Sequence, residues 1–352
     1  MTAVLIVDDS ALMRKHLSSL FKEAGMVVRT ASNGADAVQE VLNNPPDVIT
    51  LDVNMPQMDG LTALSQIMAA RPTPVVMVSS LTAKGTMATL EALAMGAVDF
   101  IEKPGGTISL SLDAVAKTLV DKVSSAARAR LAKPKPAAPA VRRVVEKPAP
   151  PVAKPPQVTP GMPDGLVLIG ISTGGPKTLE EILPALPADL RWPVLVVQHM
   201  PASFTGPLAN RLNQKCQLEV KEAAQFDRVV RGCIYIARGG TDLAVGVRNG
   251  VLVVINKPES PRYHWHPSVD GLVSSALECM PAARILGVQM TGMGNDGAEA
   301  MTDLKRRGGR TIAESEESSV VFGMPRELIE RGGASIVLPS SAIAQKIIDW
   351  AR

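Results

Sequence analysis

Residues 166–176 read LVLIGISTGGP, and this stretch decides the fold of the second half of the chain. The apolar run at 166–171 predicts a buried strand, and the glycines and proline that follow predict a turn that opens a helix. Ser172 would lie between the two, with its hydroxyl at the sheet edge and backbone N–H groups around it. Residues 170–174 match the G-x-S-x-G pattern of a nucleophile elbow, although a phosphate-binding loop or an ordinary strand-to-helix turn fits the same pattern.

Two further apolar runs end in residues that could complete a catalytic site. VLVVQ at 194–198 precedes His199, and ILGVQ at 285–289 precedes a turn that contains Asp296. Because the carboxyl ends of parallel strands share one edge, we expect Ser172, His199 and Asp296 to meet there. A serine nucleophile needs a base, and the base needs a carboxylate that orients it. Each residue alone could be structural; together, in a chain with 4 histidines, they point to a catalytic triad.

Composition excludes several classes of protein. The 352 residues allow two or three domains, and a net charge of +3 with 3% aromatic residues argues against nucleic-acid binding. Three cysteines without a C-x-x-C pair argue against a disulfide framework or a zinc site. No apolar run reaches the roughly 20 residues of a membrane span, and the first residues do not read as a signal peptide. We therefore expect a cytoplasmic protein that does not insert into membranes.

A proline-rich tract divides the chain. Ten of the 28 prolines fall between residues 134 and 163, and such a segment is extended and solvated because proline fixes φ and lacks an N–H donor. The sequence predicts a first domain at 1–125, a linker at 126–163 and a second domain at 164–352.

The first domain alternates short apolar strands with helical patterns. Strands are expected at 3–7, 27–30, 48–51, 75–78 and 99–101, and this alternation is typical of a doubly wound parallel sheet. Acidic residues gather at the strand ends, and three neighbouring carboxylates favour a hard cation such as Mg²⁺. A lysine and a hydroxyl at the same edge suit a bound phosphoryl group. The residues concerned are Asp8, Asp9, Asp52, Ser79 and Lys103.

These strand ends resemble those of a two-component receiver domain, which has a flavodoxin-like fold with five parallel strands. The resemblance rests on VDDS at 7–10, LDVNMPQMDG at 51–60 and KP at 103–104. It implies that Asp52 accepts the phosphoryl group and holds Mg²⁺ together with Asp8 and Asp9. It also implies that Lys103 contacts the phosphoryl group and that Ser79 and Phe100 are the switch residues.

The second domain is similar to the chemotaxis protein-glutamate methylesterases, whose fold is doubly wound α/β with a mainly parallel sheet. The motifs are STGG at 172–175, QHMP at 198–201, TGMGNDGA at 291–298 and VFGMP at 321–325. The resemblance implies a Ser172–His199–Asp296 triad, an oxyanion held by the backbone N–H groups of Thr173 and Met293, and no cofactor for the esterase. The order serine, histidine, aspartate differs from that of α/β-hydrolases.

Two segments depart from that family's motifs. ARGGTD at 237–242 stands where the family has Ala-Pro-Gly followed by a histidine, and YHWHPSVD at 263–270 shifts the usual histidine before Pro-Ser-Val-Asp. His264 and His266 could be taken for a metal pair, but no third ligand is evident in the sequence nearby. Packing or loop hydrogen bonding is the favoured interpretation.

The resemblances imply a phosphorylation-activated hydrolase. It would remove γ-methyl esters from glutamates on the cytoplasmic domains of methyl-accepting chemoreceptors, releasing methanol, and would deamidate receptor glutamines. A chemotaxis histidine kinase would be the phosphodonor, and the chain would be a monomer. The alternative is a phospho-switched interaction module with an inactive hydrolase domain. A DNA-binding regulator is disfavoured because no basic recognition helix is present in the sequence.

Overall fold

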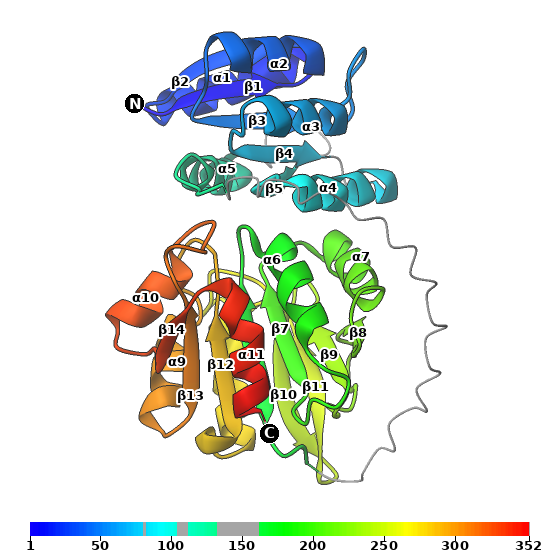
Figure 1. The fold of residues 1–352 in the computed structure, drawn as a ribbon, viewed down its shortest axis with the longest axis vertical. Helices are drawn as coiled ribbons and strands as arrows, with labels where there is room; N and C mark the ends of the chain where they lie inside the picture. Colours follow the sequence, from blue (N-terminus) through cyan, green and yellow to red (C-terminus); the bar gives the residue numbers. More distant parts are fainter. Residues whose placement is uncertain (80–81, 104–111, 132–161, 352) are drawn as a thin grey trace, which may run out of the picture.

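The computed structural model describes residues 1–79, 82–103, 112–131 and 162–351, which form two α/β units stacked along the long axis of the molecule (Figure 1). Most of the segment predicted as a linker lies outside the described residues. All three cysteines are free thiols. In the ranges that the structure describes, no helix is both long and apolar enough to cross a membrane.

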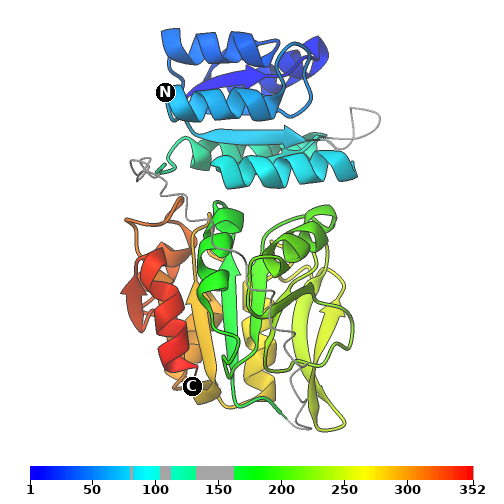
Figure 2. The same ribbon diagram turned by 45° about the vertical axis from the view of Figure 1, so that its right-hand side comes forward.

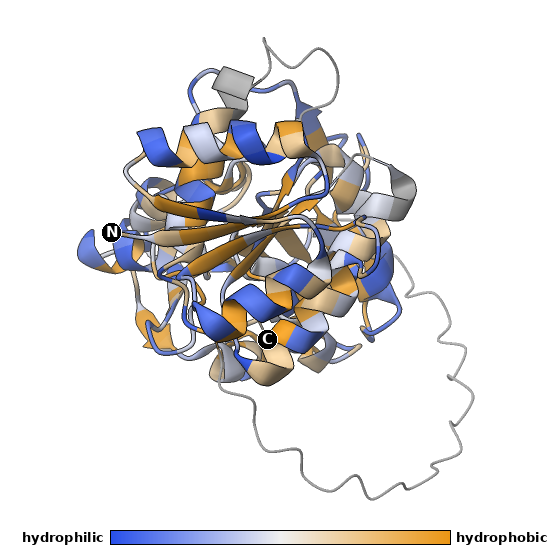
Figure 3. Ribbon diagram, turned by 90° about the horizontal axis from the view of Figure 1, so that it is seen from above, coloured by the Kyte–Doolittle hydropathy of each residue, from blue (hydrophilic) through white to orange (hydrophobic). Residues whose placement is uncertain are grey.

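The first unit has the expected parallel sheet, in the order β2-β1-β3-β4-β5. The central strands at 48–52 and 75–79 are buried along their whole length. Figure 3 shows the sheet as a hydrophobic layer between helices whose outer faces are hydrophilic. This confirms the flavodoxin-like prediction. The elements are β1 (Ala3–Val7), α1 (Ala11–Glu23), β2 (Val27–Ala31), α2 (Gly34–Asn43), β3 (Val48–Asp52), α3 (Gly60–Ala70), β4 (Val75–Ser79), α4 (Ala83–Met95), β5 (Asp99–Glu102) and α5 (Leu112–Ala126).

The second unit is built on a larger parallel sheet, in the order β14-β13-β12-β6-β7-β9-β8, with a separate antiparallel hairpin of β10 and β11. The doubly wound, mainly parallel prediction is therefore confirmed. The elements up to the hairpin are β6 (Leu166–Ile171), α6 (Gly175–Ile182), η1 (Leu183–Ala185), β7 (Val194–Gln198), α7 (Ala202–Asn213), β8 (Glu219–Glu222), β9 (Cys233–Ile236), β10 (Asp242–Arg248) and β11 (Val251–Lys257). The remaining elements are α8 (Val269–Cys279), η2 (Ala282–Arg284), β12 (Ile285–Gln289), α9 (Ala298–Arg306), β13 (Arg310–Glu314), α10 (Met324–Glu330), β14 (Ile336–Leu338) and α11 (Ser340–Trp350).

The three strands that the sequence singled out, β12, β6 and β7, are neighbours in the middle of this sheet. Their side chains are fully or almost fully buried, as expected for parallel strands covered on both faces. The loops at their carboxyl ends are joined by backbone hydrogen bonds from Ser172 N to Thr291 O (2.9 Å) and from His199 N to Ile171 O (3.1 Å). The sheet topology thus brings the predicted triad to one edge.

The first unit sits on that edge. Helix α4, strand β5 and helix α5 lie on the side that faces the second unit, and the carboxyl ends of β6 and β7 point toward them in both views (Figures 1 and 2). Phe100 of β5 packs against Phe204 of α7, with 4.1 Å between ring centroids. Val98 O accepts a hydrogen bond from Gly174 N at 3.1 Å. Helix α4 also packs on α6 and α7. We call the contact that α4, β5 and the preceding Val98 make with α6, α7 and the turn before α6 the receiver interface.

The fold makes a prediction at the start of α6. A Cβ atom on Gly175 would lie 2.0 Å from Gln198 Oε1, in a place where the side chain of Gln198 is buried and bonded to the backbone of Ser172 and His199. We expect Gly175→Ala to lower the free energy of unfolding by about 1–3 kcal/mol, because the strand and the helix must move apart. Urea unfolding followed by circular dichroism measures this.

The matched control is Gly206→Ala in α7, where an added Cβ would meet only ordinary contacts, at 3.7 Å and beyond. There the substitution is expected to leave stability within roughly 0.5 kcal/mol of wild type, because the better helix propensity of alanine is offset by the crowding of its Cβ against the ring of Pro207, the next residue. Equal destabilisation by the two substitutions would contradict the close packing of Gly175 on Gln198.

Candidate functional site

Ser172 lies at a sharp turn between β6 and α6, as the elbow pattern predicts. It is 8% exposed, at the carboxyl end of the central strand. Gly174 turns the chain with φ of +80°, a left-handed conformation that favours glycine. Gly292 leaves room beside the serine, because a Cβ there would lie 2.6 Å from the Ser172 Cβ.

His199 and Asp296 form a buried pair next to this turn. The distance from His199 Nε2 to Asp296 Oδ2 is 2.8 Å, and both side chains are at most 8% exposed. The other ring nitrogen, Nδ1, is buried and has no hydrogen-bond partner in the described part of the chain. Because Asp296 accepts from Nε2, the lone pair of a neutral His199 is on Nδ1. This is the nitrogen that is free to take a proton.

Asp296 is held as a carboxylate by the first turn of α8. It accepts hydrogen bonds from the backbone N–H groups of Val269 (2.7 Å) and Asp270 (3.0 Å) and from Ser268 Oγ (2.9 Å). Burial alone would raise the pKa of Asp296, but the hydrogen bonds from His199 and from these amides lower it below its usual value. Ser268 was not singled out from the sequence, because nothing distinguishes it there from an ordinary helix-capping serine.

The structure brings the three predicted triad residues together but does not join all of them. Among the residues that the structure describes, neither Ser172 Oγ nor His199 Nδ1 makes a hydrogen bond. The backbone N–H groups of Thr173 and Met293 likewise have no acceptor in the described ranges. Thr173 directly follows Ser172. Met293 directly follows Gly292, which packs against Ser172. Both amides are therefore available to a developing oxyanion.

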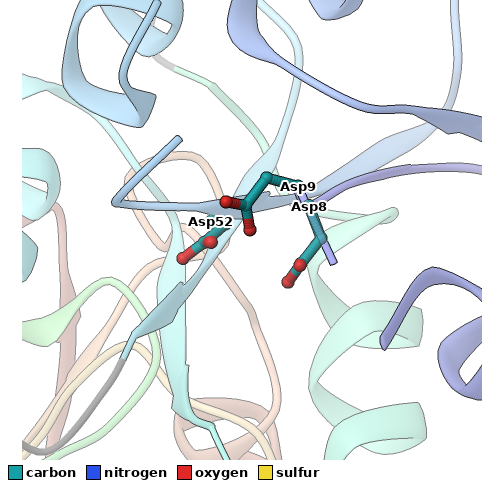
Figure 4. Close-up of side chains that lie close together, drawn as sticks. All are labelled: Asp8, Asp9 and Asp52. Carbon is teal, nitrogen blue, oxygen red and sulfur yellow. The ribbon is translucent and has the colours of Figure 1, made fainter. Parts of the chain in front are cut away.

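The predicted phosphoacceptor site forms at the far end of the first sheet. Asp52 ends β3, Asp8 and Asp9 follow β1, and Figure 4 shows the three side chains close together. One oxygen of each lies within 4.8 Å of the others. Lys103 Nζ lies 2.7 Å from Asp52 Oδ2 and 2.9 Å from Asp8 Oδ2.

The charges at this site compete. Burial raises the pKa of Asp52, and although the hydrogen bond and charge of Lys103 act in the opposite direction, the pKa stays above its usual value. Burial alone would lower the pKa of Lys103, but its hydrogen bonds to Asp52 and Asp8 raise it. Asp8 Oδ2 is buried, and the ammonium group of Lys103 is close to it but does not meet the geometry of a hydrogen bond there. An under-satisfied oxygen among three carboxylates fits a hard cation such as Mg²⁺.

The two predicted switch residues lie between the phosphoacceptor site and the second unit. Ser79 is buried at the end of β4, and its Oγ donates to Gly85 O at 3.3 Å. Phe100 is buried in the receiver interface against Phe204. Its contact with the second unit could not be predicted from the sequence, which does not show which face docks.

The receiver interface also holds the elbow itself. Thr173 Oγ1 donates to Asp99 Oδ2 at 2.6 Å, directly beside the nucleophile position. Asp99 is paired on its other side with Lys122 of α5, at 2.9 Å. Ser203 of α7, which does not follow a predicted strand, donates to Glu102 Oε1 at 2.9 Å. The residue expected to supply an oxyanion donor is thus bonded to the first unit.

The family models match both units. Residues 4–113 match the response regulator receiver domain, and residues 167–347 match the CheB methylesterase. The catalytic domain of Thermotoga maritima CheB methylesterase is 40% identical, with a TM-score of 0.51, over 53% of this chain and 97% of that structure.

Full-length relatives agree with these matches. A protein-glutamate methylesterase/protein-glutamine glutaminase of Rhodospirillum rubrum is 53% identical over 99% of this chain and 96% of its own length. One of Archaeoglobus fulgidus is 46% identical over 98% of this chain and 97% of its own length. The chain therefore belongs to the family of protein-glutamate methylesterases/protein-glutamine glutaminases, with a receiver domain ahead of its CheB methylesterase domain.

Proposed function

We propose that this chain is a phosphorylation-activated hydrolase that uses Ser172 to cleave glutamate γ-methyl esters on the cytoplasmic domains of chemoreceptors and to deamidate receptor glutamines. The observation that carries this proposal is the buried His199–Asp296 pair, whose free ring nitrogen lies at the same sheet edge as the serine turn. The full-length relatives, named for both activities, support the substrate class.

The geometry assigns each residue a step. Asp296 keeps the proton of His199 on Nε2, so that Nδ1 can accept the proton of Ser172 as its oxygen attacks the ester carbonyl. The amides of Thr173 and Met293 would hold the oxyanion. His199 then gives its proton to the departing methanol. Water, deprotonated by His199, hydrolyses the acyl-enzyme and leaves a free glutamate. For glutamine the leaving group is ammonia, and no step requires a cofactor.

The first domain would control this site through Asp52. Asp8, Asp9 and Asp52 would hold Mg²⁺, which lowers the electrostatic barrier to placing a phosphoryl group among carboxylates. A chemotaxis histidine kinase would supply the phosphoryl group, and Lys103 would contact it. Phosphorylation adds about −1.5 to −2 charges at that edge of the sheet. Ser79 and Phe100 would transmit the change to the receiver interface.

We infer that the interface restrains the enzyme by covering the elbow. Asp99 binds the Thr173 side chain, Val98 O takes the Gly174 N–H, and Phe100 packs on Phe204. With β5 seated there, the two residues that follow Ser172 are bonded to the first unit, and the serine itself is only 8% exposed. A shift of Phe100 on phosphorylation would weaken these contacts, and each tenfold activation needs only about 1.4 kcal/mol of difference between docked and released states.

The role of Ser172 is tested by Ser172→Ala. Loss of the nucleophile is expected to lower kcat for methanol release by ~10⁴–10⁶-fold. The unfolding transition is expected to stay unchanged, because the oxygen removed makes no hydrogen bond among the described residues. Methanol released from methylated receptor in the presence of a phosphodonor is the measurement. A Ser172→Ala protein that retains most of its turnover would favour another nucleophile, and unchanged receptor binding without any wild-type turnover would favour an interaction module.

The role of His199 predicts a pH dependence. His199 must be neutral to accept a proton, so kcat/KM is expected to fall as the pH is lowered and the ring becomes protonated. The pKa of Asp296 is lowered, so that carboxylate stays ionised throughout and does not cause the loss. His16→Gln in α1 and His264→Gln are the matched controls, and both are expected to keep the acid limb. Disappearance of the limb in His264→Gln would give that residue the role of the base.

The restraint is tested by removing one interface side chain. Asp99→Ala breaks the bond to Thr173, so we expect unphosphorylated protein to release methanol about 10- to 150-fold faster, from a lost hydrogen bond to a charged group of ~1.5–3 kcal/mol. Phosphorylated protein is expected to change little. The exposed Asp121 of α5 provides the control, since Asp121→Ala touches no part of the interface contacts described above. Equal basal rates for Asp99→Ala and wild type would show that this contact does not restrain the site.

A further inference from the structure

The two segments that depart from the family's motifs contact each other. Asp242 begins β10, and His266 lies in the connection between β11 and α8. His266 Nδ1 and Asp242 Oδ1 are 2.9 Å apart, and Asp242 is 3% exposed. The same carboxylate accepts backbone N–H groups from Ser260 (2.9 Å) and Ser268 (3.2 Å). The buried Asp242 carboxylate therefore fixes the connection near its start, at Ser260, and at its end, at His266 and Ser268.

The connection fixed in this way carries Trp265. Its indole lies flat on the His199 ring, with 5.6 Å between centroids and 5° between planes, which is an offset stack. The indole also covers Gly294, where a Cβ atom would lie 2.6 Å from it. His264 meets another part of the indole edge-on, at 4.7 Å. Trp265 thus touches both the base and the loop that carries Met293 and Asp296.

Ser268 joins this anchor to the catalytic pair. Its N–H donates to Asp242, and its Oγ donates to Asp296 at 2.9 Å. Ser268 itself is fully buried. His266 and Ser268 both bind the carboxylate of Asp242, so the backbone between them has little freedom. Trp265 directly precedes this fixed segment.

We propose that Trp265 is a positioning residue for His199 and that the Asp242–His266 pair is the anchor that holds Trp265 against it. This inference rests on the proposed function of His199 as the base. The stack keeps the imidazole in the plane in which Nε2 meets Asp296 and Nδ1 stays free. An indole face also attracts a cation within about 6 Å, so it stabilises the imidazolium that forms when Nδ1 takes the serine proton.

The imidazolium forms in the transition state and not in the bound substrate complex. The stack is therefore expected to act on kcat more than on KM. With full-length protein and a phosphodonor, Trp265→Leu is expected to lower kcat about 5- to 30-fold, the range of a partly desolvated cation–π contact, with KM changed less. Trp265→Phe keeps an aromatic face and is expected to recover most of the loss. An unchanged kcat in Trp265→Leu would overturn the proposal.

The anchor is tested by Asp242→Asn and by His266→Ala, which removes a half-buried side chain. Each is expected to lower kcat, and each is expected to have little further effect in the Trp265→Leu protein, because the anchor acts through Trp265. If the fold-losses in kcat of the anchor variant and of Trp265→Leu multiplied in the double variant, the anchor would not act through Trp265. If Asp242→Asn does not fold, His266→Ala still tests the anchor.

A spectroscopic measurement tests the stack without relying on catalysis. The chain has 3 tryptophans, so Trp192→Phe with Trp350→Phe leaves Trp265 as the single tryptophan, which is excited selectively at wavelengths beyond the absorption of the 2 tyrosines. A protonated imidazole quenches an indole stacked on it, so the fluorescence is expected to fall as the pH is lowered. The fall is expected to vanish in His199→Gln and to persist in Ser172→Ala.

The same variants distinguish the effect of His199 on the fluorescence from the effects of other titratable groups near Trp265. Asp296 and Asp270 lie behind His199, and burial raises the pKa of Asp270 to about 6. His264 and the Asp242–His266 pair adjoin Trp265. A titration that survives His199→Gln but not His264→Gln would come from His264 and would overturn the proposal. Failure of the proposed function looks different, since Ser172→Ala would then remain active. Failure of this inference alone leaves Ser172→Ala inactive and Trp265→Leu at full rate.

Discussion

The hydrogen bond between His199 Nε2 and Asp296 Oδ2 is the interaction on which the catalytic half depends. A carboxylate this deeply buried costs several kcal/mol unless its oxygens are fully bonded. Here the start of α8 provides two backbone N–H groups and the Ser268 hydroxyl, and the helix dipole adds to them. The bond therefore requires β7, β12 and α8 to be placed together, and this links the activity to the fold of the whole sheet.

The same sheet edge explains why a second domain can control the site. Parallel strands end in loops at one edge, so the proposed catalytic residues all lie where a docked domain can cover them. The first domain uses strand β5, which ends at Glu102, immediately before the Lys103 that pairs with the proposed phosphoacceptor Asp52. Phe100 and Asp99, three to four residues earlier, reach the second domain. Phosphoryl chemistry and the elbow are thus connected through one short, buried strand.

Much of this fold could be predicted from the sequence because buried parallel strands read as continuous apolar runs. β6, β7 and β12 were found in this way, and so were the residues at their ends. The edge strands β8 and β14 carry partly exposed or very short sequences, so their pattern is weak. The hairpin of β10 and β11 was missed although Asn249-Gly250, both with positive φ, is a strong turn signal between alternating apolar residues.

The sequence predicts those site residues whose chemical type and position at a strand end already indicate a role. Serine, histidine and aspartate at strand ends point to a triad, but Ser268, Asp99 and Trp265 act through contacts between segments far apart in the chain. Asp99 in particular has a role only because the two domains dock by one face, and docking depends on complementary surfaces that no local pattern encodes. The departures from the family's motifs at Asp242 and His266 are explained by the contact between the two side chains. The two residues are far apart in the sequence, so this contact is seen only in the structure.

The proposed function makes Ser172 an activated nucleophile that the first domain covers until Asp52 is phosphorylated. Its most direct test is the rate at which a fluorophosphonate labels the full-length protein with and without a phosphodonor and Mg²⁺, with the labelled residue identified by mass spectrometry. The account predicts a single adduct on Ser172 that forms faster with the phosphodonor, and no acceleration in Asp52→Asn. An adduct on another serine, or a Ser172 labelling rate that ignores phosphorylation, would contradict it.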